Sequence, residues 1–303
     1  MDKTINLVEN GIFPIIYDKY GKKLDKIPDT GYNIAGTIQG EGKLVGIPCL
    51  FIRTSGCNLR CAWLKENGDG SICDTPYSSF HPETNKFQID DIIEIIAKNA
   101  WQGDQKTLSH IVISGGEPTM QTESLIDLTS RLHGLGYHIT IETNATIFNE
   151  ELTKYVDLFS MSPKLSSSIP IESHLKNTTV KFNPFWKFQH EKLRKDLEVI
   201  QQYIQSCYGY TIDRDTLRSE RFVDKDFQLK FVVSTPEDIE EIKNDFLNSL
   251  KGWYSEDVIL MPEGITREEL HEKSKWVVEA CIENGWRFTP RLHIDIFGNK
   301  VGL

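Results

Sequence analysis

The chain has 303 residues, of which 39% are hydrophobic, 10% aromatic and 26% charged, and this composition argues against a disordered or fibrous protein. Its formal net charge of -10 argues against a nucleic-acid-binding surface, which would favour an excess of Lys and Arg. No apolar run approaches the roughly 18 residues of a membrane span, so a cytoplasmic protein without a membrane partner that binds a small molecule is expected.

Strand-like and helix-like segments alternate along the chain. Runs rich in β-branched and aromatic residues predict six strands, at 49–53, 110–114, 138–142, 158–162, 228–233 and 258–261. Helical periodicity predicts helices at 89–100, 122–132, 236–250 and 266–284. Asp90 and Thr235-Pro236 mark helix starts, and Gly134 and Gly285 mark helix ends. The alternation favours a parallel sheet in one α/β domain that spans residues 1–303.

Residues 182–226 break this rhythm. The segment is long, aromatic and highly charged, and it contains a helical run at 191–206 but no clear strand. We therefore expect an insertion in the domain.

Three of the six cysteines lie within seventeen residues, at Cys57, Cys61 and Cys73. A chain without a signal peptide that crowds its thiols in this way is expected to bind metal rather than form disulfides. Because an iron-sulfur cluster is normally held by four thiolates, a loop with three can leave one iron open to another ligand. Structural zinc with His81 as the fourth ligand, or buried inert thiols, are the alternatives.

The spacing of these cysteines resembles the CxxxCxxC motif of radical S-adenosylmethionine enzymes, except that eleven residues separate Cys61 from Cys73. Residues 64–71 are polar and contain glycine, so we interpret them as an inserted loop that bulges outward without moving its ends. Downstream, residues 114–118 (Ser-Gly-Gly-Glu-Pro) resemble the GGEP motif of the same enzymes, in which Glu117 would accept a hydrogen bond from an amine. Taken alone, this motif also fits an ordinary strand-to-helix turn.

The surrounding residues narrow the resemblance to one family. Residues 37–42 (Thr-Ile-Gln-Gly-Glu-Gly), 46–48, 51–53, 56–61 and 73–75 (Cys-Asp-Thr) together resemble the 7-carboxy-7-deazaguanine synthases. The resemblance covers about residues 34–75 and the later motifs, and it does not cover 182–226. It implies a modified, incomplete (β/α) TIM-like barrel of the radical S-adenosylmethionine type.

The resemblance also implies an activity. It is that of a carbon–nitrogen lyase that converts 6-carboxy-5,6,7,8-tetrahydropterin to 7-carboxy-7-deazaguanine with loss of ammonia, in 7-deazapurine (queuosine-type) biosynthesis. The implied cofactors are a 4Fe-4S cluster, S-adenosylmethionine and Mg²⁺. The implied partners are an electron donor such as flavodoxin and a second copy of the chain in a homodimer.

The resemblance also implies roles for the residues that match the motifs of this family. The cluster ligands would be Cys57, Cys61 and Cys73. The substrate would contact Ile38, Gln39, Gly40, Glu41, Arg53, Ser114, His293 and Leu303. S-adenosylmethionine would contact Ile72, Asp74, Gly116, Glu117, Glu142, Ser162, Pro163, Lys164, Met261, Pro262, Glu263 and Gly264.

Four of the matched residues have a stated chemistry. Arg53 would grip the substrate carboxylate with its bidentate fork, and Glu41 would accept hydrogen bonds from ring N–H groups. Glu142 would hold a ribose hydroxyl. Thr75 would place a hydroxyl on Mg²⁺, and capping of the turn before Pro76 is the equally favoured alternative.

Two other functions stay open at this point. An activase that abstracts hydrogen from a glycine of a partner protein would share the cysteines and the GGEP motif. A non-catalytic iron-sulfur or zinc-binding interaction module would use the glycine motifs only as turns. Arg53 and the segment 39–42 favour a small carboxylated substrate, and binding of S-adenosylmethionine would separate an enzyme from such a module.

Overall fold

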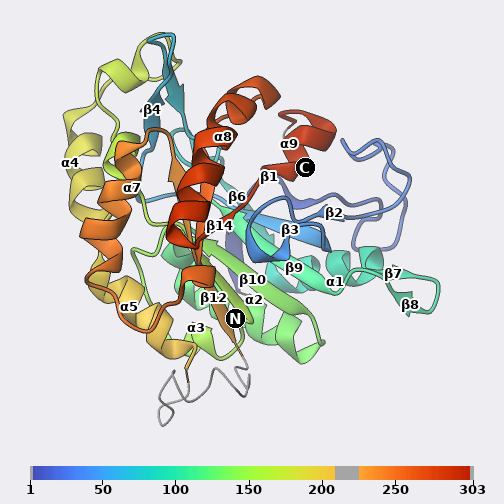
Figure 1. The fold of residues 1–303 in the computed structure, drawn as a ribbon. Helices are drawn as coiled ribbons and strands as arrows, with labels where there is room; N and C mark the ends of the chain where they lie inside the picture. The colour runs from blue at the N-terminus through green and yellow to red at the C-terminus, as the bar shows by residue number, and fades with distance from the viewer. Residues whose placement is uncertain (1–2, 209–224, 301–303) are drawn as a thin grey trace.

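A mainly parallel sheet organises the chain in the computed structural model, which describes residues 3–208 and 225–300 (Figure 1). The strand order is β14-β13-β12-β11-β10-β9-β3-β1-β6, and β2 pairs with β3. All pairs from β3 to β14 are parallel, whereas β1, β2 and β6 are added antiparallel. The strands are β1 (Thr4–Phe13), β2 (Thr37–Ile38), β3 (Pro48–Thr54), β6 (Asn85–Gln88), β9 (His110–Gly115), β10 (His138–Thr143), β11 (Leu158–Met161), β12 (Asp226–Val233), β13 (Val258–Pro262) and β14 (Arg287–Phe288).

All six predicted strands are confirmed as the parallel part of this sheet. A parallel strand covered on both faces needs a continuous apolar run, and Ile111, Val112 and Ile113 of β9 are all almost fully buried. Strand β1 was not predicted, because buried and accessible residues are mixed along this antiparallel strand. Polar residues of β1 therefore interrupt the apolar pattern from which a strand would be predicted.

Helices occupy the connections, as predicted. They are α1 (Ile89–Asn99), α2 (Thr122–Gly134), α3 (Glu150–Thr153), α4 (Pro184–Leu193), α5 (Leu197–Ser206), α7 (Glu237–Glu241), α8 (Arg267–Asn284) and α9 (Leu292–Phe297). In Figure 1, α4, α5 and α7 lie along one side of the molecule, opposite α1 and the small hairpin of β7 (Trp101–Gln102) and β8 (Gln105–Lys106). Gly285 ends α8 with φ 67°, a left-handed conformation that favours glycine.

Two predicted helices differ in detail. The run 191–206 is not one helix, because α4 ends at Leu193 and Asp196 begins α5 by accepting a hydrogen bond from the Val199 amide at 3.1 Å. The run 236–250 consists of α7 followed by the π-helical segment η5 (Ile242–Leu247). Of the expected insertion at 182–226, residues 209–224 lie outside the described part of the chain.

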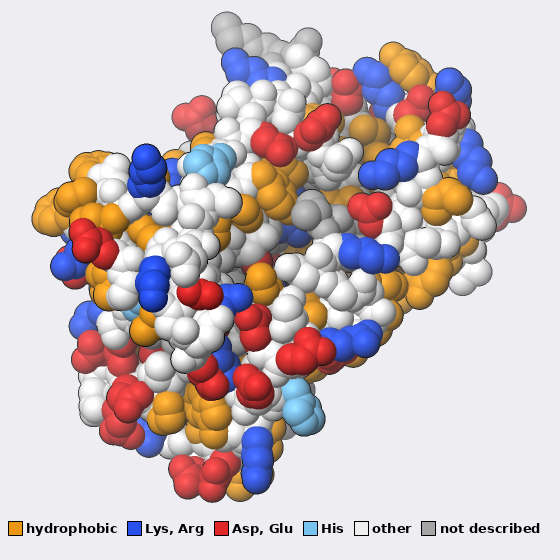
Figure 2. Space-filling view, turned by 90° about the horizontal axis from the view of Figure 1, so that it is seen from above, with side chains coloured by type: hydrophobic (Ala, Val, Ile, Leu, Met, Phe, Trp, Pro, Cys, Tyr) orange, Lys and Arg blue, Asp and Glu red, His pale blue; other side chains and the backbone are white. Residues whose placement is uncertain are grey.

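Short 3₁₀ turns complete the fold at η1 (Gly42–Leu44), η2 (Pro118–Gln121), η3 (Ser166–Ser168), η4 (Ser173–Leu175) and η6 (Ser255–Asp257). The main core packs α1, α2, α5 and η5 against the sheet, and two satellite clusters form beneath the cysteine loop. Acidic and basic side chains are interspersed over the face in Figure 2. Within residues 3–208 and 225–300, no helix combines the length and the apolar character of a membrane span.

Candidate active site

A β-hairpin explains the wide gap between Cys61 and Cys73. Its strands β4 (Ala62–Leu64) and β5 (Gly70–Ile72) pair antiparallel with Ala62 opposite Ile72, and the amide of Cys73 donates to the carbonyl of Cys61 at 3.0 Å. The eleven intervening residues therefore leave the two cysteines adjacent. The predicted outward loop at 64–71 consists of the tip and outer strand residues of this hairpin.

One cavity of ≈ 250 Å³ gathers most of the predicted site residues at the carboxyl ends of the parallel strands. Ligands bind at this end of the strands in open α/β sheets. The predicted residues that line it are Ile38, Gln39, Gly40, Glu41, Arg53, Cys57, Cys61, Ile72, Cys73, Asp74, Thr75, Ser114, Gly116, Glu142, Ser162, Lys164, Met261, Pro262, Glu263, Gly264 and His293. The structure does not bring Glu117 or Pro163 to its wall, and Leu303 lies outside the described residues.

Glu117 is fully buried beneath the cavity instead. Its carboxylate accepts hydrogen bonds from the amide and hydroxyl of Thr119, from the hydroxyl of Thr143 and from the amide of Asn144, at 2.6–3.1 Å. These four bonds occupy the carboxylate, so the expected contact with an amine of S-adenosylmethionine is not supported. Glu117 fixes the glycine turn against the end of β10.

The thiols of Cys57, Cys61 and Cys73 all line the cavity. Burial raises the pKa of Cys57 to about 12, and burial also holds the pKa of Cys61 above its usual range. The amide of Leu59 donates to Cys57 Sγ at 3.4 Å, and Asn144 Nδ2 approaches the same sulfur at 3.9 Å. Protons must therefore leave these thiols when metal binds, and N–H groups are already directed at one of the sulfurs.

A single metal ion fits the cysteines less well. Across the described residues, no three or more His, Cys, Asp or Glu side chains are grouped so that they could hold one ion. His81, the expected fourth zinc ligand, is exposed and does not line the cavity. Because each thiolate of a cluster binds a different iron, three separate thiols on one wall suit a cluster better than zinc.

Arg53, at the end of β3, presents an unpaired guanidinium. Its Nε is buried without a hydrogen-bond partner, and its guanidinium carbon lies 5.0 Å from the centre of the Phe13 ring. It forms no ion pair with any described carboxylate. Arg53 lines the cavity without a hydrogen-bonded carboxylate, so its guanidinium is suited to an anionic ligand.

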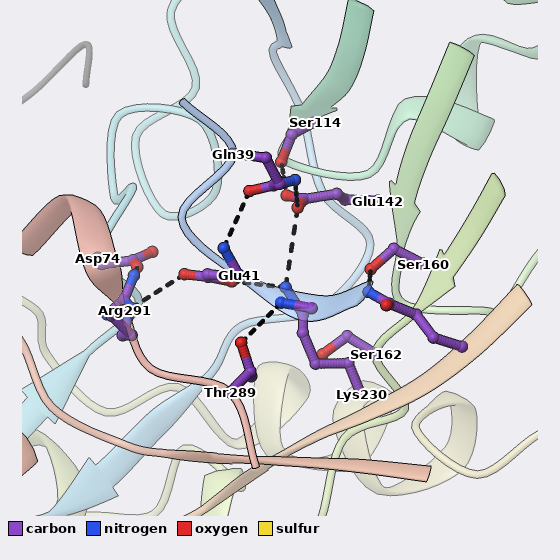
Figure 3. A network of polar contacts seen from close by, with 12 residues as sticks. Gln39, Glu41, Asp74, Ser114, Glu142, Ser160, Ser162, Lys230, Thr289 and Arg291 are labelled. Carbon is purple, nitrogen blue, oxygen red and sulfur yellow. Dashed lines mark hydrogen bonds and ion pairs between the residues drawn. The ribbon is translucent and has the colours of Figure 1, made fainter. Parts of the chain in front are cut away.

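A largely buried ion-pair network forms another part of the site (Figure 3). Glu41 accepts from Lys230 Nζ at 2.5 Å and from Arg291 Nε at 3.0 Å, and Arg291 also contacts Asp74. Burial acts to raise the pKa of Glu41, but Lys230 and Arg291 hold it well below its usual range. The same balance of burial against Arg291 lowers the pKa of Asp74. Both carboxylates are therefore ionised at neutral pH.

A second set of contacts joins residues that were expected to bind different ligands. Ser114 Oγ donates to Glu142 Oε2 at 2.7 Å, and Gln39 Nε2 donates to Glu142 Oε1 at 3.2 Å. Gln39 Oε1 accepts from the amide of Glu41 at 3.1 Å, which links this set to the ion pairs (Figure 3). The expected substrate residues and the expected ribose ligand thus share one polar wall.

His293 reaches the site from α9. A Cβ atom added to Gly40 would lie 2.3 Å from His293 Nδ1, and the amide of Leu292 donates to the Gly40 carbonyl at 3.0 Å. The absence of a side chain at Gly40 is what allows α9 to approach the loop before η1. Gly40 and His293, which were each predicted to contact the substrate, are therefore adjacent in space.

The later motifs hold the hairpin and the strand ends. Glu263 accepts from Lys273 Nζ at 2.5 Å and from Ser71 Oγ at 3.3 Å, so it ties β5 to the end of β13. Lys164 Nζ donates to Ser162 Oγ at 2.8 Å. Thr75 lies with its hydroxyl 3.4 Å from Cys73 Sγ, and its carbonyl accepts hydrogen bonds that close the following turn.

Sequence reasoning assigned no role to Lys230, Arg291 or Asn144. A signal existed for Lys230, which is a charged residue inside the apolar stretch 229–233 of β12. Arg291 lies next to the predicted His293, and Asn144 follows the predicted Glu142 by two residues, but nothing local indicates that their side chains reach the loop at 57–75.

Comparison with known proteins identifies relatives over most of the chain, although no family model matches. A 7-carboxy-7-deazaguanine synthase of Halobacterium salinarum is 36% identical over 267 residues, which cover 87% of this chain and 88% of the relative. One of Rhodopirellula baltica is 33% identical over 87% of this chain and 84% of the relative. The crystal structure of QueE from Escherichia coli is similar in fold, with a TM-score of 0.52 and 19% identity over 96% of this chain and 95% of that one.

Proposed function

The chain belongs to the family of 7-carboxy-7-deazaguanine synthases, radical S-adenosylmethionine lyases of deazapurine biosynthesis, and from this we propose how its cavity is divided among the ligands. The observation that carries the proposal is the unpaired guanidinium of Arg53 in the same cavity as Cys57, Cys61 and Cys73. The guanidinium of Arg53 offers a counter-ion for the carboxylate of the pterin substrate. The thiols offer ligands for a cluster with one open iron.

The three cysteines would hold a 4Fe-4S cluster. When bound, the cluster and S-adenosylmethionine supply a 5′-deoxyadenosyl radical that abstracts hydrogen from the substrate. The β4–β5 hairpin keeps Cys61 and Cys73 adjacent, and Glu263 holds this hairpin against the end of β13. The protein thereby fixes the cluster relative to the strand ends.

The substrate, 6-carboxy-5,6,7,8-tetrahydropterin, would bind between Arg53 and the ion-pair network. Arg53 would take its carboxylate in a bidentate contact. Glu41 is held ionised by Lys230 and Arg291, yet each of its oxygens keeps a lone pair that can accept from a ring N–H. Gln39, Ser114 and His293 would complete the polar contacts.

S-adenosylmethionine would occupy the wall formed by the glycine turn at Gly116 and the ends of β11 and β13. Thr75 is the proposed Mg²⁺ ligand, since a hydroxyl oxygen suits this hard cation. We also propose that the open sheet is an incomplete (β/α) barrel of the radical S-adenosylmethionine type. A single domain, a homodimer and a flavodoxin-type electron donor remain predictions.

Turnover under anaerobic conditions tests the function. Protein reconstituted with iron and sulfide would be incubated with dithionite, S-adenosylmethionine, Mg²⁺ and the carboxypterin, and the product would be measured by mass spectrometry. We expect 7-carboxy-7-deazaguanine and ammonia in equal amounts from the wild type, and no product from Cys73→Ala. Absence of product from protein that carries an intact cluster would exclude this assignment.

The same experiment separates the alternative functions. A glycyl-radical activase would form 5′-deoxyadenosine only when a partner protein is present, and the carboxypterin would have no effect. A non-catalytic module would bind no S-adenosylmethionine.

A further inference from the structure

A histidine from the segment at 182–226 lies against one of the cluster thiols. His190, in α4, is completely buried, and its Nε2 lies 3.6 Å from Cys61 Sγ and 3.5 Å from Ser168 Oγ. Its Nδ1 is buried without a partner. Leu59, Trp63 and Leu193 form the apolar cluster around Cys61 and exclude water from this contact.

The neighbours of His190 decide which nitrogen carries the proton. Ser168 donates its hydroxyl proton to the carbonyl of Leu165 at 2.7 Å, so toward His190 its oxygen can only accept. The nitrogen that faces Ser168 must then be the donor. The proton therefore lies on Nε2, between the serine oxygen and the sulfur of Cys61.

Metal binding strengthens one of these two contacts. A Cys61 that ligates iron has lost its proton and carries negative charge, so its sulfur is an acceptor only. A charged acceptor forms a stronger hydrogen bond than a neutral hydroxyl. We propose that His190 donates the Nε2 hydrogen to the Cys61 thiolate and thereby raises the reduction potential of the cluster.

The direction follows from electrostatics. Reduction adds one electron to the cluster and increases the negative charge on its sulfurs, so a hydrogen bond to sulfur stabilises the reduced form more than the oxidised form. His190 does not touch the substrate cavity, and it acts through Cys61. This inference rests on the proposed cluster function, and it assigns a tuning role to α4.

A potentiometric titration monitored by electron paramagnetic resonance tests it on the reconstituted, full-length protein. His190→Leu removes the donor, and His190→Gln places an amide N–H where Nε2 lies. His174→Leu is the matched control, because His174 Nδ1 contacts the carbonyls of Ala62 and Ile169 beneath the same hairpin without touching sulfur.

We expect His190→Leu to retain the cluster and to have a lower midpoint potential, whereas His190→Gln and His174→Leu stay near the wild type. A tenfold loss in the equilibrium constant for reduction would lower the midpoint by about 59 mV. Equal potentials for His190→Leu and the wild type would overturn the inference, as would an equal shift in His174→Leu.

A second measurement uses the wild-type protein and does not depend on whether the His190→Leu variant folds. In wild-type protein labelled with ¹⁵N-histidine, pulsed electron paramagnetic resonance of the reduced cluster should detect a histidine nitrogen, and this coupling should be absent from unlabelled protein and from His190→Gln. Absence of the coupling in the wild type would overturn the inference while leaving turnover intact. Failure of the wild type to assemble a 4Fe-4S cluster would overturn the proposed function as well.

Discussion

Lys230 and Arg291 are committed to Glu41, whereas Arg53 pairs with no described carboxylate, and neither do Lys164 and Lys300 of the same cavity. Arg53 offers a planar guanidinium fork rather than a point charge, so it is the side chain best suited to recognise a carboxylate from outside the protein. This division is the main electrostatic feature of the site.

Replacement of Arg53 should weaken substrate binding. Hydrogen bonds to charged groups contribute about 1.5–3 kcal/mol each, so Arg53→Gln should raise the KM for the carboxypterin roughly 10- to 150-fold. Arg53→Lys keeps the charge but loses the fork, and it should give an intermediate KM. Steady-state kinetics would measure these changes, with Arg287→Gln, an exposed residue of β14, as the control. An unchanged KM in Arg53→Gln would contradict the role.

The glycine turn should tolerate no side chain. A Cβ atom at Gly116 would lie 2.0 Å from the carbonyl oxygen of Gly56, beside the cysteine loop, whereas a Cβ at Gly134 meets nothing within 4 Å. Gly116→Ala should therefore lower the free energy of unfolding by about 1–3 kcal/mol or more. Gly134→Ala should be neutral or stabilise by about 0.4–1 kcal/mol. Urea denaturation would compare the two, and equal stabilities would contradict the packing.

The sequence identified many cavity residues because each lies in a short motif whose chemistry is local. It could not identify the partner of Glu41, because Lys230 and Arg291 follow Glu41 by 189 and 250 residues. Glu117 shows the opposite error. Its motif predicted a ligand contact, but Glu117 is fully buried, and its hydrogen bonds come from Thr119 in the following turn and from Thr143 and Asn144 at the end of β10.

Among the elements, β9 and β10 carry an unusual pair at their first residues. The rings of His110 and His138 lie 4.4 Å apart between centroids, and the Nδ1 atoms of both are buried without partners. Burial lowers the pKa of each histidine, and the neighbouring His138 lowers that of His110 further. Both rings are therefore neutral in the folded protein at neutral pH.

This pair should make stability depend on pH. Because the folded pKa values are lowered, the unfolded chain binds more protons below about pH 6.5, so the stabilisation is complete above that pH and is lost as pH falls through it. The free energy of unfolding should decrease from pH 7.5 to 5.5, and His110→Leu should reduce this slope.

Denaturation at several pH values would measure the slope, and His271→Leu on the exposed part of α8 is the control. His190 and His293, whose pKa values are also lowered by burial, contribute to the slope in all three proteins. A slope in His110→Leu that matches the wild type would contradict the assignment to this pair.

Helices and strands could be predicted where burial determines the pattern of apolar residues along the sequence. The parallel strands are largely apolar runs, and α8 begins after the capping residue Thr266 and ends at Gly285, which the sequence displays. The sequence failed where tertiary contacts decide. The β4–β5 hairpin is polar and short, and its pairing depends on packing against η4 and on Glu263 at the end of β13.

Across the whole molecule, the cavity is lined from Ile38 to Lys300, so its walls come from segments near both ends of the described chain. Ligand binding should therefore stabilise the fold as one unit. At a free ligand concentration of 100 times Kd, the expected gain is about 2.7 kcal/mol.

Thermal unfolding of the reconstituted protein with S-adenosylmethionine and the carboxypterin would measure this gain. We expect a higher midpoint in a single transition, and a smaller increase in Arg53→Gln at the same ligand concentration. A second transition that the ligands do not shift would contradict the coupling.

The contact between Glu41 and Arg291 can form only late in synthesis, because Arg291 is made 250 residues after Glu41. A ribosome that adds about 5–20 residues per second needs about 12–50 s to make the 250 residues between these partners. For most of that interval Cys57, Cys61 and Cys73 have already been synthesised, whereas the wall that Arg291 and His293 supply has not. The nascent chain thus exposes its thiols to iron-sulfur carriers, and equally to oxidants, before the site can close.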